Sequence, residues 1–204
     1  ELGLTYVDSG AMYRAVALYA LRKGYINDRQ IDRNAILEEL SNIQLHFVKQ
    51  EGGVQARIHL NGEDVEDEIR SMEVNRVVSQ VSSISAVRKK LVELQKQMGR
   101  DGGVVMDGRD IGTVVFPNAD LKVYMTADAD VRAQRRFNEL LKKGRNVSLE
   151  EVKANLLMRD KQDQERLDSP LLKAEDAVEL DNSSLSAEEQ LQSVLRMVGA
   201  LNRE

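Results

Sequence analysis

The stretch Gly103–Pro117, with the sequence GVVMDGRDIGTVVFP, decides the fold because it joins an apolar run to a charged turn. Val104–Met106 is a continuous apolar run closed by turn residues, which is typical of a strand buried on both faces of a parallel sheet. Open α/β sheets bind ligands beyond the carboxyl ends of their strands, so we expect Arg109 and Asp110 at a ligand site. Arg109 would offer a planar fork to a phosphate. The alternative is a surface turn with a local ion pair.

A second strand-to-helix turn lies near the start of the chain. Residues 4–7 favour a short strand, and apolar residues with helical spacing follow Gly10. Asp8 and Ser9 therefore lie where backbone N–H groups and the helix dipole favour an anion, with Arg14 one turn into the helix. The alternative is that Asp8 or Ser9 only caps the helix and Arg14 is solvated.

Composition limits the classes of function. The chain has 204 residues, 42% of them hydrophobic and 31% charged, and its net charge is −5, which gives no reason to expect nucleic-acid binding. Cysteine is absent and two histidines are too few for a histidine-built centre, so we assign no metal site. No membrane span or signal peptide is predicted, and a cytoplasmic monomer is expected. The chain begins at Glu1 without Met, and we expect that an N-terminal segment is missing.

The middle of the chain changes from helical to alternating periodicity and back, which predicts an inserted lobe. In chain order, the predicted elements are a helix over 31–40, strands over 43–48 and 54–60 joined by a turn at Gly52–Gly53, a short strand near 64–65, and helices over 69–81 and 86–98.

The last third combines a strand over 121–125 with an arginine-rich helical pair. Ten lysines and arginines lie from Arg132 to Arg166 in an otherwise acidic protein, and Ser148 and Glu151 form a capping-box pattern. Arg159, Asp163 and Arg166 share one helical face. The spacing fits a lid that closes over phosphates, and the alternative is an ordinary ion-pair ladder. A strand over 177–180 and a helix over 186–201 complete the chain.

Four blocks together resemble a known family. They are YVDSGAMYR (6–14), NGEDV with the following Ile-Arg (61–70), DGRDIGTVVFP (107–117), and Arg-Asp-x-x-Asp-x-x-Arg (159–166). In this order they resemble the bacterial cytidylate kinases, the (d)CMP kinases of the nucleoside monophosphate kinase family. The resemblance covers essentially the whole chain.

The resemblance implies an α/β P-loop kinase fold with a parallel sheet flanked by helices, an antiparallel β/α monophosphate-binding insert, and a helical lid. The expected parts are a core of residues 1–40, 99–130 and 167–204, the insert over 41–98, and the lid over 131–166. The family's P-loop and first strand precede the YVDSGAMYR block, yet no GxxxxGK[ST] occurs in this sequence. We expect the missing strand between Leu4–Val7 and Val104–Met106, where its loss would leave a groove.

The resemblance also implies ATP-dependent phosphorylation of CMP and dCMP with Mg²⁺ as cofactor. It assigns catalytic roles to Asp107, Arg109 and Arg159. Residues matching the family's substrate-binding positions are Ser9, Arg14, Ser79, Arg88, Arg109, Asp110, Arg159, Asp163 and Arg166. Of these, Ser79, Arg88 and Asp110 would read the cytosine edge, and Asp163 would contact the ribose hydroxyls. Residues that bind ATP remain unassigned. A non-catalytic nucleotide-binding module and a kinase for another monophosphate, such as UMP, stay open as alternatives.

Overall fold

The protein divides into two compact units, Glu1–Ile111 and Gly112–Glu204, in a computed structural model. The structure describes residues 2–27, 30–49 and 56–201. The three-part division expected from the sequence stays a prediction.

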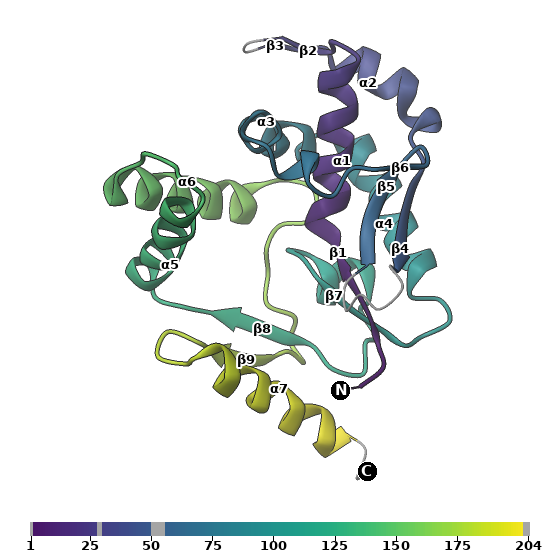
Figure 1. The fold of residues 1–204 in the computed structure, drawn as a ribbon. Coiled ribbons are helices and arrows are strands. Elements are labelled where there is room, and N and C mark those ends of the chain that lie inside the picture. Colours follow the sequence, from purple (N-terminus) through teal and green to yellow (C-terminus); the bar gives the residue numbers. More distant parts are fainter. Residues whose placement is uncertain (1, 28–29, 50–55, 202–204) are drawn as a thin grey trace. The chain divides into compact units, whose positions relative to one another are not determined.

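The first unit contains three groups of paired strands and four helices within its described residues (Figure 1). Its elements are β1 (Thr5–Asp8), α1 (Ser9–Arg22), β2 (Ile26–Asn27), β3 (Gln30–Ile31), α2 (Arg33–Glu39), the 3₁₀ turn η1 (Leu40–Asn42), β4 (Leu45–Lys49), β5 (Ala56–Leu60), β6 (Glu63–Asp64), the 3₁₀ turn η2 (Glu68–Arg70), α3 (Met72–Ser82), α4 (Ser85–Met98) and β7 (Val104–Asp107).

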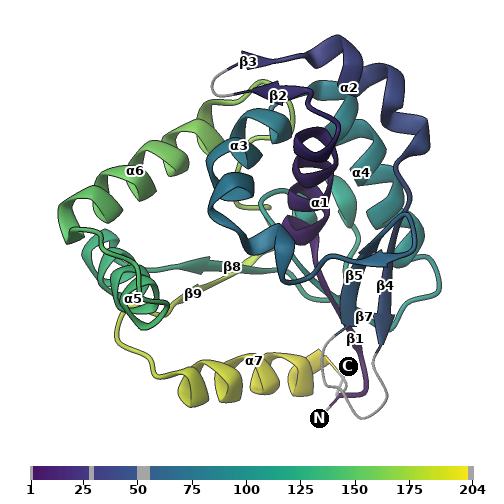
Figure 2. The same ribbon diagram turned by 45° about the horizontal axis from the view of Figure 1, so that its top comes forward.

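Helix α1 is the centre of the first unit's core. Its residues from Ala11 to Ala20 are buried except Arg14, and the helix packs against α3, α4, η2 and β5. Figures 1 and 2 show α1 with α3 on one side and α4, β4 and β5 on the other. The alanines of α1 carry short side chains, which allow this close approach from several directions. The core continues into α4 through Leu91, which is fully buried.

Strands β1 and β7 pair directly and in parallel. Thr5 pairs with Val104 and Asp8 with Asp107, and the Thr5 N–H donates to the Gly103 carbonyl at 2.8 Å. The expectation of a groove or a further strand between these two segments was therefore wrong, because their backbone groups already bond to each other. The presence of a P-loop segment before Glu1 stays a prediction.

The burial predicted for β7 was also wrong. Val105 is 46% exposed, and its register partner Tyr6 is 40% exposed. Val7, on the opposite face of β1, is 2% exposed. Alternate residues of a strand point to opposite faces. Helix α1 contacts β7, and the face that carries Tyr6 and Val105 is open to solvent.

The predicted antiparallel hairpin is confirmed as the sheet β4–β5–β6, whereas its role as an inserted lobe stays a prediction. The predicted turn at Gly52–Gly53 lies outside the described residues. The second turn uses Asn61 and Gly62 with φ of 50° and 88°, the left-handed conformation that a tight hairpin turn requires. Ile31, predicted to start a helix, instead lies in β3, and α2 begins after the Asp32 side chain caps it.

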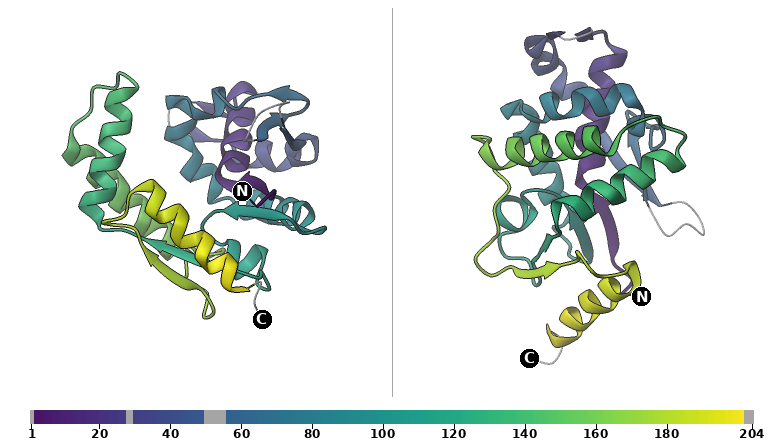
Figure 3. Two further views of the ribbon diagram at one scale, coloured as in Figure 1. Left: turned by 60° about the horizontal axis from the view of Figure 1, so that its bottom comes forward. Right: turned by 90° about the vertical axis from the view of Figure 1, so that its left-hand side faces the viewer.

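The second unit combines a parallel strand pair with a helical pair (Figure 3). Its elements are the π-helical turn η3 (Ile111–Val115) at the unit boundary, β8 (Val123–Thr126), α5 (Ala129–Lys142), α6 (Leu149–Glu165), β9 (Val178–Asp181) and α7 (Ala187–Leu201). The predicted capping box is confirmed: the Glu151 N–H donates to Ser148 Oγ at 3.1 Å, and the Ser148 N–H donates to the Glu151 carboxylate at 3.0 Å.

Truncating Leu91 to alanine should lower the free energy of unfolding by about 2–5 kcal/mol, since the side chain is fully buried in the core cluster. The matched control is Leu37→Ala, because Leu37 is 41% exposed, and its effect should stay near 0.5 kcal/mol. Urea denaturation followed by circular dichroism measures both. Equal effects for the two variants would contradict the position of the core.

Candidate functional site

The carboxyl ends of β1 and β7 bring two predicted turns together. Asp8 caps α1 by accepting from the Ala11 N–H at 3.0 Å, and Ser9 next to it is 3% exposed. A Cβ atom placed on Gly108 would lie 2.3 Å from Ser9 Oγ, so the two turns touch at a position that tolerates no side chain. Glycine is required here by close approach, since its φ is not in the left-handed region.

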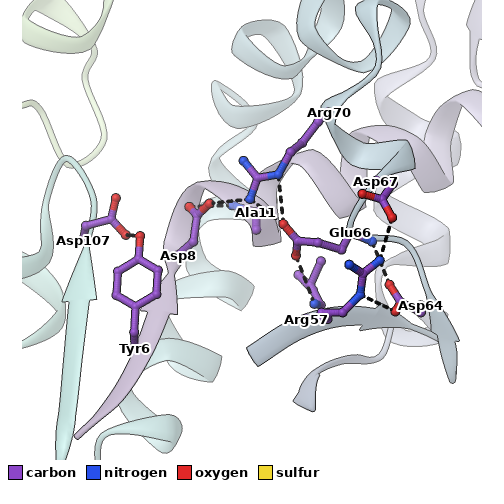
Figure 4. Close-up of polar contacts among 10 residues, drawn as sticks. Tyr6, Asp8, Ala11, Arg57, Asp64, Glu66, Asp67, Arg70 and Asp107 are labelled. Carbon is purple, nitrogen blue, oxygen red and sulfur yellow. Dashed lines mark hydrogen bonds and ion pairs between the residues drawn. The ribbon is translucent and has the colours of Figure 1, made fainter. Parts of the chain in front are cut away.

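Asp107 lies beside Asp8 as its register partner and accepts a hydrogen bond from the Tyr6 hydroxyl at 3.0 Å (Figure 4). Desolvation and the neighbouring Asp8 carboxylate raise the pKa of Asp107 above its ordinary value, while the Tyr6 bond and the charge of Arg109 act in the opposite direction. Desolvation and the Asp107 carboxylate also raise the pKa of Tyr6 well above the ordinary tyrosine value.

Arg70 links this edge to the acidic segment Glu63–Glu68. Its guanidinium lies 2.5 Å from Glu66 and 3.4 Å from Asp8, as Figure 4 shows. Arg14 reaches the same corner, because a Cβ on Gly10 would lie 3.1 Å from Arg14 Nη1 and 3.0 Å from Asp8 Oδ1. The turn after β7 carries Arg109, which is exposed.

Two of the predicted base-reading residues form a buried ion pair. Arg88 in α4 donates to Asp110 Oδ2 at 2.6 Å, and both side chains are 4% exposed. The Arg88 guanidinium lies 5.3 Å from the ring centroid of Tyr13, within the range of a cation–π contact, and also donates to the Ser82 carbonyl at 3.4 Å. Ser79, the third predicted residue, is half-buried in α3.

The remaining predicted residues belong to the second unit. Arg166 follows α6 and donates to Asp163 at 3.2 Å and to the Ser169 carbonyl at 2.6 Å. Arg159 is half-buried, and its neighbour Asp160 pairs with Arg132 of α5 at 2.6 Å. The expected role of Arg159 in substrate binding stays a prediction.

Sequence reasoning missed Tyr6, Tyr13 and Arg70. Tyr6 and Arg70 stood inside quoted blocks, at the first position of one and the last of another, but their contacts depend on strand register and on the fold of the acidic segment. Tyr13 also lay inside a block, but no role was predicted for it from the sequence.

The described residues contain neither a metal-binding cluster nor a membrane-spanning helix. Within 2–27, 30–49 and 56–201, no group of three or more His, Cys, Asp or Glu side chains could hold a metal ion. No helix in that part of the chain is long and apolar enough to cross a membrane.

The α/β architecture, with parallel strand pairs and flanking helices, is that of the P-loop nucleoside monophosphate kinases. A family model described as cytidylate kinase matches residues 1–200, and the chain belongs to this family. The chain is 53% identical over 198 residues to a cytidylate kinase of Flavobacterium johnsoniae, which covers 97% of this chain and 86% of the relative. It is 46% identical over 204 residues to a cytidylate kinase of Bacteroides thetaiotaomicron, which covers 100% of this chain and 89% of the relative.

Replacing Gly108 with alanine should displace Ser9, because the new Cβ would lie 2.3 Å from Ser9 Oγ and 2.9 Å from Ile111. We expect a destabilisation of about 1–3 kcal/mol, the usual cost of overpacking, measured by urea denaturation. The control is Gly199→Ala in α7, where a Cβ meets nothing within 4 Å. That substitution should be neutral or slightly stabilising, and a matching loss in both variants would count against the close contact.

Removing Asp110 should cost more than removing an exposed carboxylate. Asp110→Ala would leave the Arg88 charge buried without its carboxylate partner, with an expected loss of about 3–5 kcal/mol. The control is Asp67→Ala, which breaks an ion pair between Asp67 and Arg57. Because the Asp67 side chain is 90% exposed, this substitution should cost at most about 1 kcal/mol. Denaturation midpoints and slopes of both variants measure the difference, and similar losses would refute the burial of the pair.

Proposed function

We propose that this protein transfers a phosphoryl group from ATP to CMP or dCMP and so produces CDP or dCDP. Membership of the cytidylate kinase family, whose members are phosphotransferases, supports the reaction type. The single observation that carries the choice of base is the buried pair of Arg88 and Asp110. The pair holds a guanidinium and a carboxylate side by side, and its Asp110 lies in the turn after β7, at the edge where ligands of such sheets bind.

This pair complements the edge of cytosine. Cytosine presents an N4 donor next to N3 and O2 acceptors, so a carboxylate accepts from N4 while arginine donates to the acceptors. Uracil presents an O4 acceptor in place of the N4 donor, and the Asp110 carboxylate would then face another acceptor. Ser79 would add a hydroxyl to the same base. The arrangement therefore favours CMP and dCMP over UMP.

The acceptor phosphate is assigned to three arginines. Arg14, Arg109 and Arg159 would surround it, since a planar guanidinium binds phosphate oxygens two at a time. Ser9 at the amino end of α1 would donate its hydroxyl to the same phosphate. Asp163 would accept from the ribose hydroxyls, and Arg166 would contact the substrate from the lid side.

The chemistry needs positioning and charge neutralisation rather than a covalent intermediate. Held arginines stabilise the charge that spreads over the transferred group, and a closed lid excludes water. Asp107 would hold Arg109 in place by its negative charge. Mg²⁺ accompanies ATP in such reactions, but the described residues supply no cluster of ligands for it. No residue of this chain is assigned to ATP binding either.

A substrate panel tests the proposal. Steady-state assays with ATP and with CMP, dCMP, UMP or AMP should give the highest kcat/KM for CMP or dCMP. Discrimination against UMP should be about 5- to 150-fold, the range of one good base-edge contact of about 1–3 kcal/mol. A preference for UMP would favour a kinase for another monophosphate. Binding of CMP without turnover would favour a non-catalytic nucleotide-binding module.

Arg88→Met should weaken CMP binding by about 1–3 kcal/mol, because it removes the donor to the cytosine acceptors. Isothermal titration measures CMP and ATP separately, and ATP affinity should change little. Arg88→Lys keeps the charge but loses the planar fork, so its CMP affinity should lie between those of the parent and Arg88→Met.

The control for this experiment is Arg100→Met, which removes an exposed arginine just after α4. Circular dichroism checks that each variant is folded, since Arg88→Met leaves Asp110 without its buried partner. Unchanged CMP affinity in folded Arg88→Met would contradict the assignment of Arg88 to the base.

A further inference from the structure

Tyr6 has no part in the proposed function, yet its hydroxyl lies at the centre of the β1–β7 edge. Tyr6 pairs in register with Val105, and Asp8 pairs with Asp107. Because side chains alternate along a strand, Tyr6, Asp8 and Asp107 all project from one face of the strand pair. From that position the Tyr6 hydroxyl reaches diagonally across the pair and donates to Asp107 Oδ1 at 3.0 Å (Figure 4).

The two carboxylates at this edge are held differently. Asp8 accepts from the Ala11 N–H at the start of α1 and lies 3.4 Å from the Arg70 guanidinium. Asp107 accepts from Tyr6, and Figure 4 shows its second oxygen directed away from the ring. Since register places Asp107 directly beside Asp8, ionisation of Asp107 is opposed by a like charge.

The groups that face Asp107 come from three segments. Asp8 of β1 and desolvation favour the protonated form, whereas Tyr6 of β1 and Arg109 of the turn after β7 favour the carboxylate. Arg70, the last residue of η2, acts on this cluster through its contact with Asp8. The backbone N–H of Asp107 also favours the carboxylate through a hydrogen bond, and Tyr6 is the side chain that does so. The Tyr6 bond therefore acts on both the orientation and the charge of Asp107.

We propose that Tyr6 is a positioning residue for CMP phosphorylation: it fixes the Asp107 carboxylate and keeps it ionised, so that Asp107 can hold Arg109 for the acceptor phosphate. The inference rests on the proposed function, in which Arg109 contacts that phosphate. Tyr6 itself touches no substrate. Its removal should therefore act through the protonation of Asp107 and should be strongest at low pH.

The test compares Tyr6→Phe with Tyr19→Phe. Tyr19 also donates to a carboxylate, that of Glu39 at 2.7 Å, at the other end of α1, so the control removes the same kind of bond away from the site. We expect the acid limb of kcat/KM for CMP to move to higher pH in Tyr6→Phe. At pH values below that limb, kcat/KM should fall about tenfold, the scale of one hydrogen bond to a charged group. At the alkaline plateau it should stay within about twofold, and Tyr19→Phe should keep the parent profile at every pH.

A second measurement separates this inference from the proposed function. Carbon-13 NMR of the aspartate carboxyl groups, with the Asp107 signal assigned by its loss in Asp107→Asn, follows the ionisation of Asp107 without any turnover. The pKa of Asp107 should be higher in Tyr6→Phe than in the parent and unchanged in Tyr19→Phe. If the unsubstituted protein failed to phosphorylate CMP, the proposed function would be wrong. The NMR titration would still show whether Tyr6 controls the ionisation of Asp107.

Two outcomes overturn the inference. The first is an Asp107 pKa that is the same in the parent and in Tyr6→Phe. The second is a loss of kcat/KM in Tyr6→Phe that is equal at all pH values, which would make the tyrosine a structural residue only. Thermal unfolding of both variants shows whether a loss of kcat/KM comes from a loss of folded protein. In that case the NMR titration of the folded fraction remains decisive.

Discussion

The parallel pairing of β1 with β7 is the constraint on which the first unit's site depends. The two strands are about a hundred residues apart in the chain, and their register sets Asp8 beside Asp107. The same register brings Ser9 against Gly108, where a single Cβ would not fit. A one-residue slip would turn Asp107 to the opposite face of the pair and remove it from Tyr6. The hydrogen-bonded ladder therefore does more than hold two strands together, because it fixes which polar groups meet at the carboxyl edge.

The buried pair of Arg88 and Asp110 adds a second constraint, one that connects α4 to the turn after β7. Two charges removed from water are expensive, and their attraction offsets that cost only with good geometry and further contacts. Here the contacts are a 2.6 Å bond, the Tyr13 ring and the Ser82 carbonyl. A pair of apolar residues of similar volume would fill this space without the desolvation cost. The retention of charge is understandable if the pair serves recognition, since neither side chain could be exchanged for an apolar one without losing its donor or acceptor.

The sequence predicted local elements well and their mutual contacts poorly, for a physical reason. Helical and alternating periodicity depend on neighbouring residues, and the β4–β5 hairpin and the Ser148–Glu151 capping box were accordingly confirmed. The exposure of Val105 and the direct β1–β7 ladder depend on what packs on a strand from elsewhere in the chain, which no local pattern records. The family resemblance assigned Arg88 and Asp110 to one base edge, whereas their direct ion pair appears only once α4 and the turn after β7 are placed together. Tyr6 was missed because its bond to Asp107 crosses the ladder diagonally.

The acidic segment Glu63–Glu68 is connected to that edge by an arginine side chain. Arg22 pairs with Glu63 and Glu68. Arg57 pairs with Asp64 and Asp67, and Arg70 pairs with Glu66 (Figure 4). Each exposed ion pair of this kind adds little stability. Together, however, the pairs hold carboxylates of the acidic segment against arginines of α1, β5 and η2. Arg70 differs from the other two arginines because it also contacts Asp8, the residue that caps α1 and adjoins Asp107. The position of the acidic segment is thereby coupled to the carboxyl end of β1 through one guanidinium, and any group that competes for Arg70 would act on both.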